Sequence, residues 1–145
     1  MILTALFSLL IAPLLARTNA ISRLDVLARL MMGALFVLAG AGKAGALQET
    51  QVYMAEFGIP AGLVWPTIAF ELVAGGLLIV GVGSRLVALA LAVFTLASAM
   101  VFHRVVSDPT QMVMLLKNIA IAGGLLLFVK HGSETFSFDR KLQKE

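Results

Sequence analysis

Four long apolar stretches, separated by short polar connections, dominate the chain. They run over residues 26–46, 62–81, 85–102 and 111–130. Each is close to the ~20 residues that a helix needs to cross ~30 Å of hydrocarbon. Because backbone polar groups in lipid must be hydrogen-bonded within the protein, a spanning stretch of this kind is expected to be helical. The pattern therefore predicts an all-α fold, an integral membrane antiparallel four-helix bundle.

The polar connections carry residues that are typical of turns and helix ends. Residues 56–62, EFGIPAG, have the composition of a turn, and residues 81–84, GVGS, form a tight connection. The segment Ser107-Asp108-Pro109 supplies an N-cap followed by a proline suited to the first helical turn. These signals separate the four predicted helices at the positions where the apolar pattern stops.

The two ends of the chain differ from the predicted bundle. The first residues are apolar, contain Pro13, and lack the basic start and small-residue cleavage site of a signal peptide. We expect residues 1–23 to form an extra apolar N-terminal helix, either lying at the interface or making a short span. Residues 24–132 then form the four-helix membrane domain, and residues 133–145 form a polar tail.

The composition supports a lipid-facing surface. Of 145 residues, 60% are hydrophobic and 13% are charged, whereas about a quarter of the residues of a soluble domain are charged. The net charge of +3 reflects membrane orientation, and nucleic acid is not an expected partner. Lysines and arginines are enriched in cytoplasmic connections. One side of the predicted bundle carries most of them, and the C-terminus is therefore predicted to be cytoplasmic: Arg17, Arg23, Arg29, Arg85, Lys130, Arg140, Lys141 and Lys144.

The residue types exclude several kinds of redox and metal site. The chain has no cysteine, which excludes disulfides, iron–sulfur clusters and thiolate metal sites within it. His103 and His131 fall at opposite ends of the predicted bundle, ~30 Å apart, so they cannot both ligate a single haem. We predict no metal site.

Several polar side chains lie inside or beside the predicted spans. At ~1.5 Å per residue, they fall in the half of the bundle away from the basic side, and their burial in lipid is costly. We expect them to converge on the bundle interior, with Lys117 and Asn118 facing Glu71. They are Lys43, Glu71, Gln111, Lys117 and Asn118. His103 ends the third span on the same outer side.

Two interpretations of this cluster remain open at this point. One is a polar pocket that binds a quinone headgroup or conducts protons. The other is structural: the lysines extend toward the membrane surface, and Glu71 forms a salt bridge with Lys117 or Lys43.

Several motifs, taken in order, resemble the DoxX family of small four-helix membrane proteins. They are RLMMGALFVLAGAGK, Gly58-Ile59-Pro60, ELVAGGLLIVGVGSRLVAL, His103 and QMVMLLKNIAIAGGLLL, and they extend over about residues 24–139. The family is similar to the membrane subunit of thiosulfate:quinone oxidoreductase, and some members are associated with oxidative-stress complexes. The resemblance draws attention to Arg29, at the inner end, together with Lys43, Glu71, His103, Gln111, Lys117 and Asn118.

Three functions fit these observations. The first, implied by the resemblance, is a quinone-interacting membrane subunit of an oxidoreductase or oxidative-stress complex in the bacterial inner membrane, with quinone as candidate cofactor and redox proteins as partners. The second is a scaffold that anchors partner proteins without chemistry of its own. The third is a small-solute or proton transporter, for which four spans would need a homo-oligomer. The residues alone assign no catalytic role.

Overall fold

The computed structural model describes residues 18–133 and Asp139, and this part of the chain contains helices and no strand. The elements are α2 (Thr18–Gly45), α3 (Leu47–Glu56), the 3-10 turn η1 (Ala61–Leu63), α4 (Val64–Val80), α5 (Ser84–Phe102) and α6 (Pro109–His131). The all-α prediction is confirmed. Most of the predicted N-terminal helix and of the polar tail lies outside the described residues.

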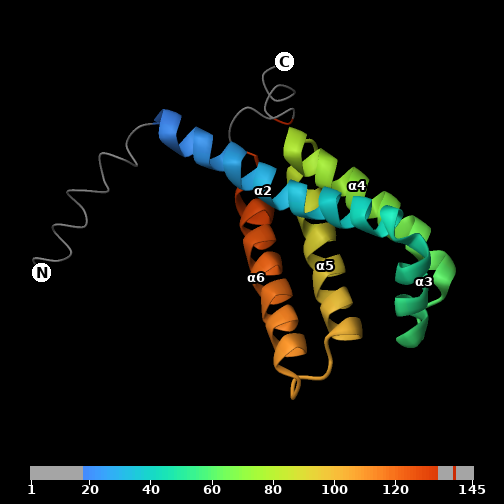
Figure 1. Cartoon of the computed structure of the whole chain (residues 1–145). Helices are drawn as coiled ribbons and strands as arrows, with labels where there is room; N and C mark the ends of the chain where they lie inside the picture. The colour runs from blue at the N-terminus through green and yellow to red at the C-terminus, as the bar shows by residue number, and fades with distance from the viewer. Residues whose placement is uncertain (1–17, 134–138, 140–145) are drawn as a thin grey trace, which may run out of the picture.

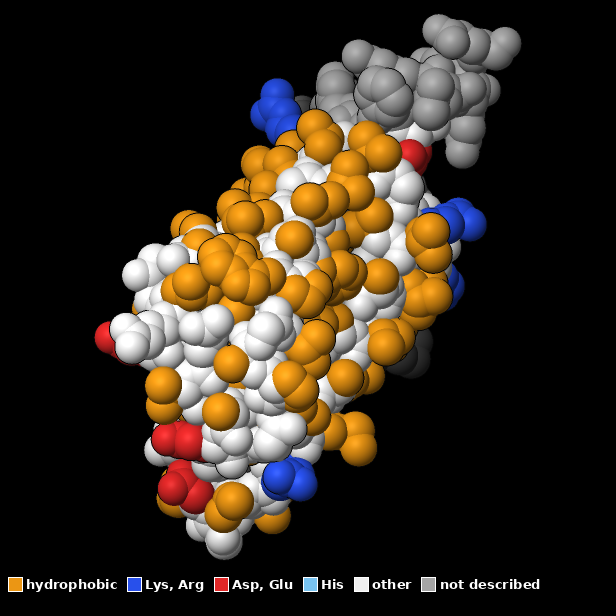
Figure 2. Space-filling view, turned by 90° about the vertical axis from the view of Figure 1, so that its right-hand side faces the viewer, with side chains coloured by type: hydrophobic (Ala, Val, Ile, Leu, Met, Phe, Trp, Pro, Cys, Tyr) orange, Lys and Arg blue, Asp and Glu red, His pale blue; other side chains and the backbone are white. Residues whose placement is uncertain are grey.

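Four segments are long and apolar enough to cross a membrane: Arg23–Gly45, Ala61–Val80, Ser84–Phe102 and Pro109–His131. They agree with the predicted spans within three residues at each end. The helix of the first span is longer than its apolar run, since α2 already begins at Thr18. Figure 2 shows hydrophobic side chains over most of one face, as expected of a surface that contacts lipid.

The helices form two pairs (Figure 1). α2 packs along α4, and α5 packs along α6, whereas α4 and α5 contact each other much less. The antiparallel order of the predicted bundle is present, but the two pairs diverge away from the α4–α5 connection. This divergence leaves room between the pairs.

A close approach of two glycines holds the first pair together. A Cβ atom at Gly75 of α4 would lie 2.8 Å from the carbonyl oxygen of Gly33 of α2, and a Cβ at Gly33 would lie 2.6 Å from the carbonyl oxygen of Gly75. Such distances are too short for any side chain. Small residues therefore allow the two backbones to pack directly, as they commonly do in membrane helix pairs.

The hydrophobic core lies where the four long helices meet. Its buried residues come from all four: Phe36, Ala74, Leu78, Ala88, Leu91, Ala92, Ala122, Leu125 and Phe128. The connection between α4 and α5 is short because Gly81 and Gly83 adopt φ angles of 75° and 58°, which glycine tolerates without strain. This turn fixes the second pair against the first at one end.

A buried polar group lies at that end, which we call the inner end because the lysine and arginine pattern predicts it to be cytoplasmic. The side chain of Arg29 is 1% exposed, and its Nε lies 3.3 Å from the Asp25 carboxylate. It also donates a hydrogen bond of 3.3 Å to the carbonyl oxygen of Ile79. Arg29 thus ties α2 to the end of α4.

Asp139, from the tail, caps α5 at the same end. Its carboxylate accepts hydrogen bonds of 2.7 and 2.9 Å from the backbone N–H groups of Gly83 and Ser84. The Ser84 hydroxyl also bonds to that of Ser133. Burial opposes ionisation, but the hydrogen bonds from Ser84 and Gly83 and the positive charge of Arg29 outweigh it, so the pKa of Asp139 lies below its ordinary value of 3.8.

Asp139→Ala is expected to release this cap. Removing a capping carboxylate costs roughly 0.5–2 kcal/mol, and hydrogen exchange of the Gly83 and Ser84 amides should accelerate. Because the folded pKa is lowered, the stabilisation exists above pH 3.8 and is lost as the pH falls through the folded value. In acid, the free energy of unfolding of the wild-type protein should therefore approach that of the variant. The amides of Thr110 and Gln111, which Asp108 caps at the other end, serve as the internal control.

Candidate functional site

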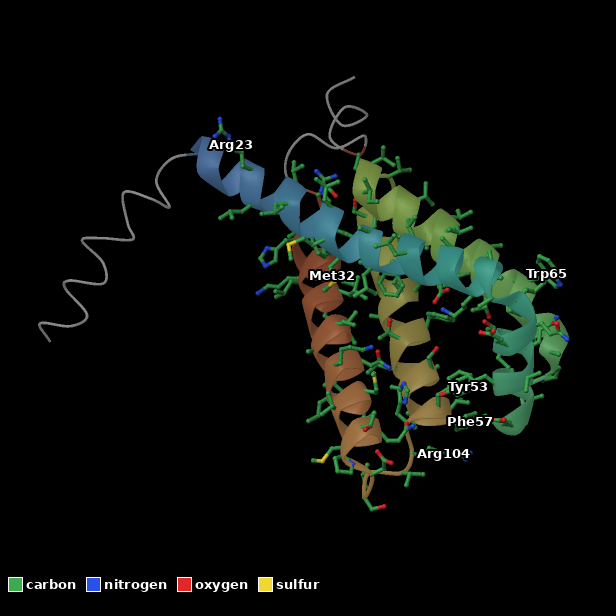
Figure 3. The ribbon with its side chains drawn as sticks, viewed as in Figure 1. Arg23, Met32, Tyr53, Phe57, Trp65 and Arg104 are labelled. Atoms are coloured by element: carbon green, nitrogen blue, oxygen red, sulfur yellow. The ribbon has the colours of Figure 1, made fainter. Side chains whose placement is uncertain are left out.

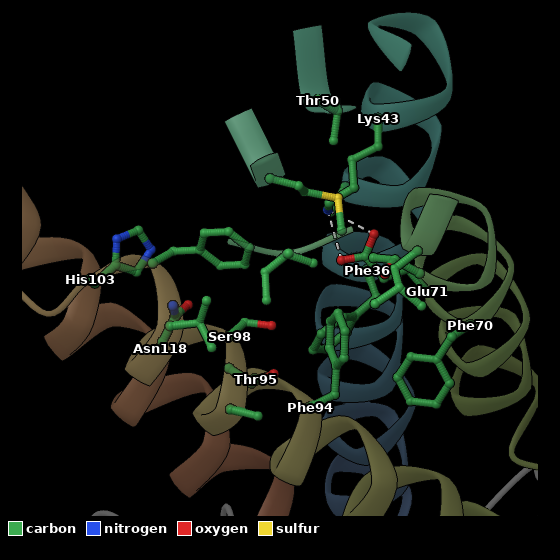
Figure 4. A pocket seen from close by; sticks show the side chains of 18 of the residues that line it. Phe36, Lys43, Thr50, Phe70, Glu71, Phe94, Thr95, Ser98, His103 and Asn118 are labelled. Atoms are coloured by element: carbon green, nitrogen blue, oxygen red, sulfur yellow. Dashed lines mark hydrogen bonds and ion pairs between the residues drawn. The ribbon is translucent and has the colours of Figure 1, made fainter. Parts of the chain in front are cut away.

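A cavity of about 730 Å³ lies between the two helix pairs, in the half of the molecule away from Asp139. α2 and α4 form one wall, α5 and α6 form the other, and α3 contributes Thr50, Tyr53 and Met54. Most of the lining side chains are aliphatic or aromatic (Figure 4). Leu35 and Leu63, which line it, are 38% and 47% exposed. The cavity therefore reaches the surface that faces lipid.

An ion pair occupies the wall formed by α2 and α4. Lys43 Nζ lies 2.8 Å from both carboxylate oxygens of Glu71, and the two side chains are 30% and 5% exposed. Gly40 makes this approach possible, because a Cβ there would lie 3.2 Å from the Cβ of Glu71. Glu71 is thus a buried carboxylate whose charge is compensated from the neighbouring helix.

Besides Lys117 of α6, polar groups without formal charge line the opposite wall. Thr95, Ser98 and Asn118 reach the cavity from α5 and α6, and Figure 4 shows them facing the side that carries Lys43 and Glu71. The Thr95 hydroxyl donates to the Leu91 carbonyl oxygen at 2.7 Å. Ser98 and the Asn118 amide provide hydrogen-bonding groups to an otherwise apolar space.

His103 and Gln111 close the outer end of this wall. His103 lines the cavity, and its Nδ1 lies 2.7 Å from Gln111 Oε1. A carbonyl oxygen accepts, so with the amide in this orientation Nδ1 donates, and Nε2 of a neutral imidazole is an acceptor. The hydrogen bond joins the end of α5 to the first turn of α6.

Three aromatic rings join α3 to the end of α5. The ring centroids of Tyr53 and Phe57 lie 5.4 and 5.1 Å from that of Phe102, and 5.0 Å from each other. Figure 3 shows Tyr53 of α3 and Phe57, which directly follows that helix, on the side of α3 that faces α5. Sequence reasoning missed this aromatic cluster, although the spacing of four between Tyr53 and Phe57 places them on one face of a helix.

The structure brings most of the predicted site residues together. Lys43, Glu71, His103, Lys117 and Asn118 line one cavity, and Gln111 is held beside it by its bond to His103. Arg29 does not belong to this group, since it lies at the inner end. Within the described residues, no group of three histidine or acidic side chains could hold a metal ion.

Of the two salt bridges that the sequence left open for Glu71, the structure has the one with Lys43 and not the one with Lys117. Lys43 is the partner of Glu71, whereas Lys117 Nζ lies 3.4 Å from the Met114 sulfur. The reason is the pairing of the helices. α2 packs directly along α4, but α6 packs on α5 and faces α4 across the cavity.

Comparisons with known proteins agree with the membrane character of the fold. A DoxX family model matches residues 24–104. Inner membrane protein YqjF of Escherichia coli is 38% identical over 121 residues, which are 83% of this chain and 92% of that protein. Inner membrane protein YphA of Escherichia coli is 29% identical over 123 residues, covering 80% and 88% of the two chains. No solved structure matches the chain.

Proposed function

The chain belongs to the DoxX family of membrane proteins, and from this premise we propose that it binds a quinone in the cavity between its helix pairs. It would serve there as the membrane subunit of an oxidoreductase or oxidative-stress complex. The observation that carries the proposal is the cavity itself, an apolar and aromatic space in the spanning region with polar groups on two facing walls.

The cavity suits a quinone by size and by chemistry. Its volume of about 730 Å³ lies within the roughly 300–1,000 Å³ of typical ligand sites, which are mostly apolar with a few placed polar groups. A quinone is a flat ring with two carbonyl acceptors. Phe36, Phe70 and Phe94 provide apolar contact for the ring, and the Lys43 ammonium and the Asn118 amide are hydrogen-bond donors on facing walls. The exposed Leu35 marks a route of entry from lipid.

The type of membrane is proposed from the relatives, and the orientation in it from the distribution of lysines and arginines. Both relatives are named as inner membrane proteins of a bacterium, and we place this chain in the same kind of membrane. The cytoplasmic side of the C-terminus stays a prediction from the lysine and arginine distribution. Since the chain has no cysteine, electron transfer to or from the quinone would involve a partner redox protein or an organic cofactor.

Quinone retained after gentle detergent extraction tests the proposal. We expect a near-stoichiometric amount in the wild-type protein and its loss in Ser98→Phe, because Ser98 lines the cavity and a phenyl ring would fill part of it. Ala120→Phe is the matched control, since Ala120 is exposed on α6 outside the cavity lining. Extraction followed by chromatography and mass spectrometry measures the ratio. If no quinone is retained by the folded wild-type protein, the scaffold function is favoured.

A further inference from the structure

The charges of the cavity do not balance. Its described lining contains one carboxylate, Glu71, and two ammonium groups, those of Lys43 and Lys117. The charge of Glu71 is paired with Lys43, because both of its oxygens accept from that ammonium. Tyr53 of α3 and His103, which follows α5, also line the cavity, and neither side chain is a carboxylate.

Lys117 is therefore a cation without a carboxylate partner among the described residues. The side chain is exposed, and its Nζ lies 3.4 Å from the Met114 sulfur, which is a weak acceptor. Lys117 lies ~12 Å along α6 from its first residue, within the apolar span Pro109–His131. An ammonium at such a depth is costly unless an anion or water accompanies it.

We propose that Lys117 provides the countercharge for an acidic quinone, one whose ring carries an ionised hydroxyl group. This inference rests on the proposed function and specifies its substrate class. The ring would lie between the aromatic side chains, its oxyanion would accept from Lys117, and a carbonyl oxygen would accept from a donor on either wall. Charge-assisted hydrogen bonds are roughly twice as strong as neutral ones, so Lys117 determines specificity for the ionised headgroup.

Two probes of nearly the same size separate charge from ring shape. They are a 3-alkyl-2-hydroxy-1,4-naphthoquinone, which is anionic at neutral pH, and its neutral 2-methoxy ether. We expect the wild-type protein in neutral detergent to bind the acid about tenfold more tightly than the ether. Lys117→Met should abolish this preference by weakening binding of the acid while leaving binding of the ether unchanged. Unchanged binding of the ether also shows that the variant is folded.

Two further variants complete the design. Lys117→Arg keeps the charge and should keep most of the preference. Lys130→Met removes an exposed lysine of the same helix at the inner end and should keep all of it. Oleate, an anion without a quinone ring, should compete weakly with the acidic probe.

The outcomes distinguish this inference from the proposed function. Equal binding of both probes, unaffected by Lys117→Met, would overturn the role of Lys117 and leave a neutral quinone site in place. Binding of oleate as tight as that of the acidic probe would identify a site for anionic lipids and overturn the inference. Failure of both probes to bind would contradict the proposed function as well.

Discussion

Lys43→Met is expected to destabilise the protein more than the double change Lys43→Met/Glu71→Gln. The single variant leaves the 5% exposed carboxylate of Glu71 without a countercharge. Breaking a buried ion pair in this way costs roughly 3–5 kcal/mol, whereas replacing both partners by neutral groups of similar size is often close to neutral. Because Lys43 keeps 30% of its surface exposed, we expect the lower end of that range. Unfolding in detergent with increasing denaturant measures the free energy.

Lys117→Met is the matched control for this cycle. It removes an ammonium from the same cavity, but one whose contact is a thioether 3.4 Å away. Lys117 is exposed, and a surface substitution away from buried ion pairs usually alters stability by about 0.5 kcal/mol or less. If the double variant loses as much stability as the Lys43→Met and Glu71→Gln single variants lose together, the two residues do not interact. A loss of stability in Lys117→Met that Glu71→Gln relieves would indicate that Glu71 pairs with Lys117 instead of Lys43.

Gly75→Ala and Gly76→Ala are expected to change stability in opposite directions. A Cβ at Gly75 would lie 2.8 Å from the Gly33 carbonyl oxygen and 3.1 Å from the Phe36 Cβ, whereas a Cβ at Gly76 would meet nothing within 4 Å. Relieving the first contact requires α2 and α4 to separate, and such overpacking costs roughly 1–3 kcal/mol. At Gly76 the higher helix propensity of alanine should stabilise by up to about 1 kcal/mol.

The same unfolding measurement compares the two glycine variants. A second readout is quinone retention, since separating α2 from α4 also displaces the Lys43–Glu71 pair. Gly75→Ala should weaken retention, and Gly76→Ala should not. Equal stability of the two variants would show that α2 and α4 do not pack through Gly33 and Gly75.

The apolar pattern predicts the four spans well because each span is a long local feature. The pattern does not predict α3 (Leu47–Glu56), which is short and on average only weakly hydrophobic. α3 is positioned by tertiary contacts, such as those of the buried Met54 with residues of α4. Local signals also predict the N-cap of α6, where Asp108 accepts from Thr110 and Gln111.

The partners within the site depend on which helices pair. The depth of Glu71, Lys43 and Lys117 follows from counting residues, and all three do reach one cavity. Their relative directions do not follow from counting, because the sequence alone leaves the pairing of α2 with α4 and of α5 with α6 undetermined. For the same reason, the bond of Gln111 to His103 was not predicted, although both residues were identified.

Photolabelling with an azido-substituted quinone tests the quinone site most directly. After illumination of the protein in membranes, peptide mass spectrometry locates the attached label. We predict attachment to cavity-lining residues of both walls, such as Phe70 on α4 and Phe94 on α5, and its suppression by excess unlabelled quinone. Attachment spread over exposed positions such as Leu86 and Leu127, without suppression by the competitor, would contradict a quinone site between the helix pairs.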